Sequence, residues 1–138
     1  MTAAADAEAT QDIAEVLVRY ATGIDRRAWA VFRTCFTDDV LAEYEGNGTW
    51  RSVDEITEFM VRIHAGMGHT LHRLSNIAIN VDGETATART YVDAVLMSAD
   101  TTTGLNTVGY YDDDLVHTND GWRITHRRFT TIHTRTIL

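Results

Sequence analysis

The chain has 138 residues, 44% of them hydrophobic and 23% charged, which is enough for one globular domain with a single core. Its formal net charge of −8 disfavours nucleic acid and anionic membranes as partners, because both repel an acidic protein. No apolar run approaches the roughly 18 residues that a membrane-spanning helix requires.

The residue types also exclude several kinds of chemistry. All 12 residues counted as Lys or Arg are Arg, so a lysine Schiff base or a lysine nucleophile is excluded. The single cysteine, Cys35, excludes an internal disulfide and a zinc site built from several cysteines. Without a His-Glu-x-x-His pattern or a compact carboxylate cluster, we expect no metal site. Residues 1–11 lack the basic and apolar regions of a signal peptide, and we expect a cytoplasmic protein.

Helical periodicity dominates the first part of the chain. An amphipathic helix is expected from about Ala7 to Ile24, and its apolar stripe consists of Ile13, Val16, Leu17, Tyr20, Ala21 and Ile24. Asp25 then stands where a second helix starts. As the N-cap of that helix, its carboxylate would accept from the backbone N–H of Arg27 or Ala28. The apolar side of the second helix carries Trp29, Phe32, Cys35 and Phe36, and the helix is expected to end at residues 37–39.

A strand pair and a third helix are expected next. Residues 40–45 favour a short strand, residues 46–48 (Gly-Asn-Gly) favour a turn, and residues 49–51 are expected to return antiparallel. Ser52 followed by Glu55 is a capping box, which predicts a helix start. The apolar face of this helix consists of Ile56, Phe59, Met60, Ile63 and Met67.

From His69 onward the pattern favours long strands separated by tight turns. Four strands are expected at residues 71–81, 85–98, 106–118 and 122–133, which together form an antiparallel meander. Strands that follow helices indicate the α+β class, and a curved sheet wrapped against three helices would enclose a pocket. We expect a flexible N-terminus over residues 1–10 and a single domain over residues 11–138.

A family resemblance rests on four features of the sequence. They are the order of these elements, the Tyr-x4-Asp-x3-Trp pattern that begins at Tyr20, a histidine early in the first long strand, and the Asp-Gly-Trp-Arg turn at residues 120–123. The chain resembles the SnoaL-like branch of the nuclear transport factor 2-like, cone-shaped α+β superfamily over roughly residues 12–129. Within that branch it is most similar to the group of scytalone dehydratase, bile-acid 7α-dehydratase and hexachlorocyclohexane dehydrochlorinase.

The resemblance implies a catalytic dyad and a helix tyrosine. Asp25 matches the family aspartate at the end of the first helix, His72 the histidine that removes a proton, and Tyr20 the tyrosine of the bile-acid enzyme. Arg127 falls where the dehydrochlorinase has a pocket arginine, and a slip of one residue would select His126 or Arg128 instead. Two departures are Ala94, where the bile-acid enzyme has an acidic residue, and the lack of a second histidine in residues 97–103.

Structural explanations compete with these roles. The alternative for Asp25 is the N-cap of the second helix. The alternative for His72 is a strand histidine whose ring is hydrogen-bonded within the protein, and the alternative for the Tyr20 ring is a place in the core. Further substrate-binding candidates are Tyr110 and Asp112 on one face of the third long strand, Asn76 on the face of His72, and Trp29 and Phe59, both of which also fit a core role. Asp112 either reaches the pocket or belongs to a solvated edge formed by residues 112–114, because an unpaired buried carboxylate is costly.

From the resemblance we expect a cofactor-independent lyase of the dehydratase type that acts on a small, apolar, polycyclic or polyketide-like metabolite of secondary metabolism. An isomerase or a polyketide cyclase on the same scaffold is one alternative, and a non-catalytic ligand-binding dimeric module is another. The sheet face that carries Tyr91, Val95 and Met97 suggests a homodimer or a higher homo-oligomer.

Overall fold

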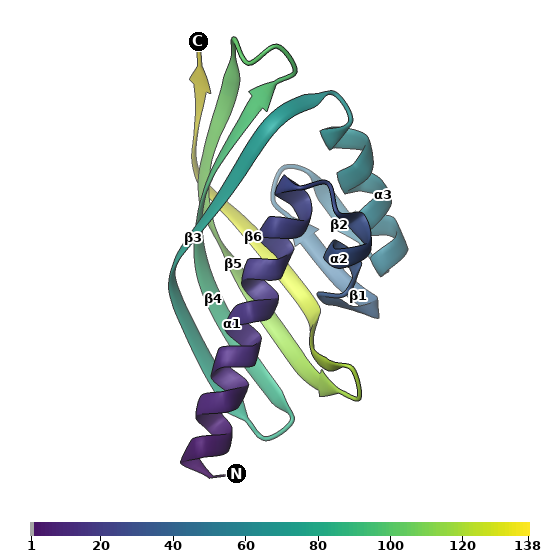
Figure 1. Ribbon diagram of the computed structural model, residues 1–138, viewed down its shortest axis with the longest axis vertical. Helices are drawn as coiled ribbons and strands as arrows, with labels where there is room; N and C mark the ends of the chain where they lie inside the picture. The colour runs from purple at the N-terminus through teal and green to yellow at the C-terminus, as the bar shows by residue number, and fades with distance from the viewer. Residues whose placement is uncertain (1) are drawn as a thin grey trace.

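The computed structural model describes residues 2–138, which form three helices and six strands (Figure 1). The elements in chain order are α1 (Ala3–Asp25), α2 (Trp29–Arg33), β1 (Phe36–Tyr44), β2 (Gly48–Trp50), α3 (Val53–His64), β3 (Met67–Asp82), β4 (Thr85–Ser98), β5 (Gly104–Thr118) and β6 (Gly121–Ile137). The expected α+β class and the element order are confirmed.

The strands form one curved, open sheet in the order β2-β1-β6-β5-β4-β3. Strands β3 to β6 are the expected antiparallel meander, and β1 pairs with β2 in the expected antiparallel way. The pairing of β1 with β6 is parallel, which the sequence did not indicate. Parallel neighbours need a long connection, and here that connection contains β2, α3 and the first three strands of the meander.

Helix α1 lies across the concave face of the sheet, with α2 and α3 beside its C-terminal half (Figure 1). It begins at Ala3, four residues before the expected start, because the side chain of Thr2 caps it by accepting from the backbone N–H of Ala5 at 3.1 Å. Within residues 2–10 only Ala9 is buried. The helix therefore includes most of the segment expected to be flexible, whose mobility stays a prediction.

The second helix differs from its expected form. It ends at Arg33, and Phe36 already belongs to β1. Its N-cap residue is Ala28, without a side-chain hydrogen bond, so the N-cap role expected for Asp25 is wrong. The capping box of α3 is confirmed: Ser52 Oγ accepts from the backbone N–H of Glu55 at 3.1 Å.

A buried ion pair lies between the sheet and α1. Arg127 Nε and Nη2 donate to the two carboxylate oxygens of Asp113 at 2.7 and 2.8 Å, and the side chains are 1% and 0% exposed. The guanidinium carbon lies 4.1 Å from the ring centre of Tyr20 and 3.9 Å from that of Tyr111. Burial alone would lower the pKa of Arg127, but the charge of Asp113 raises it well above its usual value. The pair is therefore charged and supports two aromatic rings.

The inward face of β5 is the opposite of the one that the sequence suggested. Tyr111 and Asp113 point inward, whereas Tyr110 and Asp112 lie on the outer face, where Arg89 pairs with Asp112 at 2.8 Å and covers the Tyr110 ring. Because side chains alternate along a strand, a shift of one residue exchanges the two faces. Tyr110 and Asp112 are thus excluded from the pocket.

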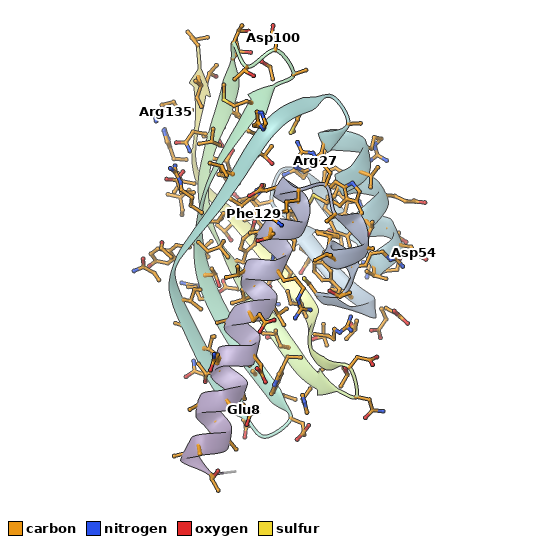
Figure 2. The ribbon with its side chains drawn as sticks, viewed as in Figure 1. Glu8, Arg27, Asp54, Asp100, Phe129 and Arg135 are labelled. Carbon is orange, nitrogen blue, oxygen red and sulfur yellow. The ribbon has the colours of Figure 1, made fainter. Side chains whose placement is uncertain are left out.

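The outer face of the sheet carries the side chains named for self-association. Tyr91 is 47% exposed there, while Val95 and Met97 are half-buried. Figure 2 shows Arg135 pointing away from the helices on this side of the molecule. Assembly through this face stays a prediction.

Replacement of Arg127 by Met should lower the free energy of unfolding by about 3–5 kcal/mol, because it leaves the carboxylate of Asp113 buried without a partner. Urea unfolding followed by circular dichroism measures this loss. Arg89→Met is the matched control, since it breaks a two-bond Arg–Asp pair on the outer face of the sheet, where the two side chains are 52% and 28% exposed. Its loss should be much smaller, and equal losses would contradict the prediction.

Candidate functional site

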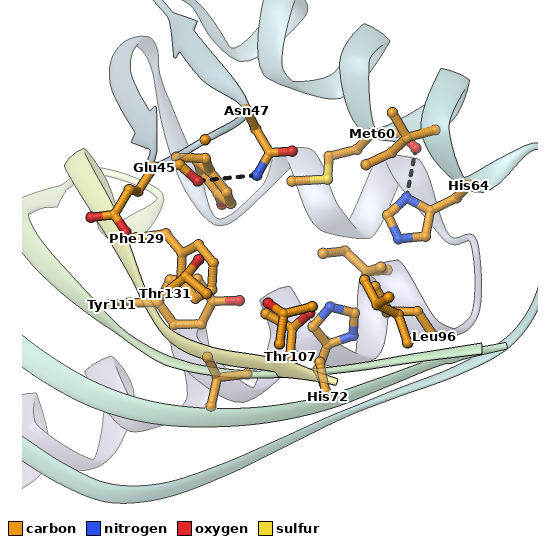
Figure 3. Close-up of a pocket in the computed structure, with 18 of the residues that line it drawn as sticks. Glu45, Asn47, Met60, His64, His72, Leu96, Thr107, Tyr111, Phe129 and Thr131 are labelled. Carbon is orange, nitrogen blue, oxygen red and sulfur yellow. Dashed lines mark hydrogen bonds between the residues drawn. The ribbon is translucent and has the colours of Figure 1, made fainter. Parts of the chain in front are cut away.

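A cavity of about 660 Å³ lies between the helices and the concave face of the sheet (Figure 3). Most of its lining is apolar and comes from α1, α3 and the meander. The apolar part comprises Ile24, Phe59, Met60, Ile63, Met67, Val92, Ala94, Leu96, Leu105 and Phe129. The polar part comprises Tyr20, Tyr44, Glu45, Asn47, His64, His72, Thr107, Tyr111, Thr131 and Thr134. The cavity suits a mostly apolar molecule that is held by a few polar groups.

Asp25 and His72 meet at the wall of this cavity. His72 Nδ1 lies 2.7 Å from Asp25 Oδ1, and the two side chains are 10% and 17% exposed. An ionised carboxylate only accepts, so Nδ1 carries the proton in this hydrogen bond and Nε2 of the neutral ring keeps a free lone pair. The ring contributes to the cavity lining. The arrangement is that of a histidine oriented for general-base chemistry.

The carboxylate of Asp25 is held by three donors from β3. Besides the ring of His72, the backbone N–H of His72 donates to Oδ2 at 2.9 Å and the Thr70 hydroxyl donates to Oδ1 at 2.9 Å. Burial alone would raise the pKa of Asp25, but the hydrogen bonds from His72 and Thr70 outweigh it and lower the pKa from its ordinary value of 3.8. Asp25 is therefore an anion at neutral pH.

Arg27 fixes the end of α1 against β3. Its Nη1 donates to Ile24 O and to the Thr70 hydroxyl, both at 2.9 Å, and its Nη2 donates to Gly68 O at 2.6 Å. Figure 2 places Arg27 at the C-terminal end of the helix, where a cation also complements the helix dipole. Thr70 thus links Arg27 to Asp25. The sequence offered one signal for Thr70, since strand alternation puts it on the face of His72.

Tyrosine hydroxyls occupy the floor of the cavity. The hydroxyls of Tyr20 and Tyr44 lie 2.5 Å apart, and the Tyr111 ring packs edge-on against Tyr20 at a centroid distance of 5.6 Å. Burial raises the pKa of all three groups, although the nearby Arg127 acts in the opposite direction. The hydroxyls therefore stay protonated and can donate to an oxygen that gains negative charge.

The other candidates are divided between the cavity and the rest of the fold. Phe59 lines the cavity, whereas Trp29 is half-buried behind it against Phe32 and His64. Asn76 is exposed at an irregularity of β3, with a φ of 50°, and does not reach the cavity. Arg127 lies beneath the tyrosine rings rather than in the cavity lining.

The two alternatives to Arg127 also lie outside the cavity lining. His126 Nε2 is 2.5 Å from Glu43 Oε2, and Arg128 Nη1 is 2.7 Å from His126 Nδ1. None of the three basic residues considered at this position is therefore placed to bind a ligand in the cavity.

Tyr44, Tyr111 and His64 are among the cavity residues that reasoning from the sequence missed. Tyr44 is the inward residue at the end of β1, and Tyr111 is the inward neighbour of Tyr110. His64 follows Met60 by four residues on α3, and this spacing places both on one helix face. In each case the periodicity of the element carried the signal.

Within residues 2–138 no helix is long and apolar enough to cross a membrane. In the same part of the chain, no three His, Cys, Asp or Glu side chains are grouped so that they could hold one metal ion.

Comparison with known proteins establishes the family. The SnoaL-like domain matches residues 5–128. The chain belongs to the SnoaL-like family. An uncharacterised protein of Mycobacterium tuberculosis is 30% identical over 118 residues, which cover 84% of this SnoaL-like chain and 80% of that protein.

Solved structures share the fold of this SnoaL-like chain. A Novosphingobium aromaticivorans protein named as an aromatic ring hydroxylase has a TM-score of 0.87 at 24% identity, with 95% of this chain and 94% of that chain covered. A protein of the same organism named as a scytalone dehydratase has a TM-score of 0.84 at 22% identity, with 91% of this chain and 85% of that chain covered. A hexachlorocyclohexane dehydrochlorinase has a TM-score of 0.82 at 15% identity, with 97% of this chain and 90% of that chain covered. The likeness confirms the nuclear transport factor 2-like fold.

Acid should destabilise the protein partly through Asp25. Because its pKa is lower in the folded protein, the unfolded chain takes up this proton first as the pH falls. The stability that the carboxylate contributes is complete above about pH 5 and is lost as the pH falls through the folded pKa. Between pH 6 and pH 3, Asp25→Asn should therefore lose less unfolding free energy than the wild type in urea titrations.

Asp38→Asn, which removes an exposed carboxylate on β1, is the control and should follow the wild type. Equal losses in the wild type and Asp25→Asn would contradict the prediction.

Proposed function

We propose that the protein is a cofactor-independent lyase of the dehydratase type that acts on a small, largely apolar, polycyclic or polyketide-like metabolite. The observation that carries the proposal is the 2.7 Å hydrogen bond between Asp25 and His72 at the wall of a mostly apolar cavity. Family membership and the fold shared with proteins named as a dehydratase and a dehydrochlorinase agree with it.

In the proposed reaction, His72 Nε2 removes a proton from a carbon next to a carbonyl group. Asp25 stabilises the imidazolium that forms. Of the hydrogen-bonded Tyr20 and Tyr44 hydroxyls, the one that accepts in their mutual bond keeps its own proton and donates it to the carbonyl oxygen as that oxygen gains negative charge. The electron pair of the broken C–H bond then forms a carbon–carbon double bond, and the neighbouring C–O bond breaks. The departing hydroxide takes the proton from His72 and leaves as water, which restores the neutral base.

The lining limits the class of substrate. About 660 Å³ of mostly apolar space accommodates a fused-ring molecule, and the polar lining includes three tyrosines and two histidines beside Glu45, Asn47 and three threonines. A substrate with one carbonyl end and an apolar body would place its carbonyl at the tyrosines. The carbon next to it would then lie toward His72.

The hydrogen bond between Asp25 and His72 also favours an enzyme over a ligand-binding module, which would not need an oriented histidine with a free nitrogen. An isomerase or a cyclase would use the same base but would return the proton or close a ring. Product mass distinguishes these reactions, because only the dehydratase product is lighter by one water.

His72→Asn tests the base directly. The Asn amide can still donate to Asp25, but the nitrogen that corresponds to Nε2 is lost. We expect kcat/KM to fall by about a hundredfold to ten-thousandfold. A suitable substrate is 3-hydroxy-1-tetralone, a bicyclic β-hydroxy ketone that gives 1-naphthol when it loses water, and naphthol absorbance reports turnover.

His117→Asn is the matched control. His117 Nδ1 also pairs with a carboxylate, Glu84 at 2.8 Å, but its side chain is 47% exposed and lies outside the cavity lining. Its turnover should equal that of the wild type. Unchanged turnover in folded His72→Asn protein would end the proposal.

A further inference from the structure

His64 is a second histidine of the cavity, and it comes from a different element than His72. It lies at the C-terminal end of α3, is 5% exposed and contributes to the lining, whereas His72 reaches the same cavity from β3 (Figure 3). Trp29 packs behind its ring at a centroid distance of 5.7 Å. The ring is therefore held between a tryptophan and the cavity.

The hydrogen bond at Nδ1 fixes the tautomer of His64. Nδ1 lies 2.8 Å from the carbonyl oxygen of Met60, one helical turn earlier. A carbonyl oxygen only accepts, so Nδ1 carries the proton and Nε2 of the neutral ring is an acceptor. The hydrogen bond to Met60 therefore makes Nε2 the hydrogen-bond acceptor of the His64 ring.

Nε2 of His64 has no protein partner within residues 2–138, and it is not among the sealed side-chain atoms that lack a partner there. It therefore has access to the cavity space. Figure 3 shows the ring with one nitrogen bonded to Met60 and the other directed into the cavity. A ligand that fills the cavity without a donor at this point would remove water from Nε2 and leave it unpaired, which is costly.

The surroundings of the two histidines separate their roles. Burial lowers the pKa of His64, with Arg27 and His72 acting in the same direction, while the Met60 carbonyl and Asp25 act against it. Among residues 2–138 no carboxylate bonds to the His64 ring, whereas Asp25 bonds to the His72 ring and is placed to stabilise an imidazolium there. His72 is thus suited to take up a proton, and His64 is suited to remain a neutral acceptor.

We infer that His64 is a substrate-binding residue that accepts a hydrogen bond from a hydroxyl group, so that the ligand of this cavity is a hydroxylated ring compound rather than a hydrocarbon or a plain ketone. The hydroxyl bound here is one that the substrate keeps, because an acceptor does not assist a departing hydroxide. The inference rests on the proposed function in taking the cavity as the substrate site.

Binding of 1-naphthol and its methyl ether, 1-methoxynaphthalene, tests the inference without turnover. The two compounds share the ring system, but only naphthol can donate. By titration calorimetry we expect the wild type to prefer naphthol by about fivefold to tenfold, which corresponds to one neutral hydrogen bond. A wild type that binds neither compound, or both equally, would overturn the inference.

His64→Phe and His72→Asn identify the acceptor. The phenyl ring keeps the packing against Trp29 but removes Nε2, so His64→Phe should lose the preference for naphthol while retaining affinity for the ether. His72→Asn should keep the preference. Retention of the preference in His64→Phe would overturn the inference. Together with loss in His72→Asn it would assign the hydroxyl to His72, and together with retention in His72→Asn it would assign the hydroxyl to the tyrosines. These experiments measure binding alone. Their result can therefore be interpreted even if the protein does not catalyse the proposed dehydration.

A measurement on the wild type covers the case in which His64→Phe does not fold. In ¹⁵N NMR spectra, His64 Nε2 should resonate as an unprotonated ring nitrogen and should move upfield when naphthol binds but not when the ether binds. A protonated Nε2 in the free protein, or the same response to both compounds, would contradict the inference.

Discussion

The hydrogen bonds that the Asp25 carboxylate accepts from β3 are the interaction on which the site depends. A carboxylate at the end of α1 is unfavourable for the helix dipole and partly buried, so it needs donors. The side chain of Thr70 and the backbone and ring of His72 supply them, and these groups lie 45 and 47 residues further along the chain. The same bonds attach helix to sheet, lower the pKa of Asp25 and set the tautomer of His72. Structure and proposed chemistry therefore share one set of contacts.

A second ionic element lies below the cavity. The Arg127–Asp113 pair is sealed beneath Tyr20 and Tyr111, and its charge faces the rings rather than a ligand. The cavity is thus arranged as a floor of protonated tyrosines, one histidine bonded to a carboxylate and one histidine bonded to a backbone carbonyl. Because the histidines have different partners, they have different chemistry: His72 is the proposed base and His64 the proposed acceptor.

Much of this arrangement could be predicted from the sequence. The helices, the strand meander and the turns followed from periodicity and from glycine and capping signals, and the family resemblance pointed to Asp25 and His72 as a pair. The role of Asp25 as N-cap of α2 was locally reasonable, but the donors that it meets come from β3. Nothing in residues 20–30 indicates that contact.

Two other errors have equally physical causes. Tyr110 and Tyr111 are both aromatic and are followed by three aspartates, so alternation alone could not identify the inward face of β5. The choice depends on Asp113 pairing with Arg127 across the sheet, a contact between strands. His64 was missed because its partner is a carbonyl of its own helix and its exposure to the cavity depends on where β3 and β4 pack.

The central claim is that Asp25 holds His72 with its Nε2 open to the cavity. The ¹⁵N resonances of the His72 ring, recorded at neutral pH in the wild type and in Asp25→Asn, test this claim most directly. The account predicts a protonated Nδ1 and an unprotonated Nε2 in the neutral ring of the wild type, with a mixture of tautomers once the carboxylate is removed. A neutral His72 ring with its proton on Nε2 in the wild type, or the same tautomer population in both proteins, would contradict it.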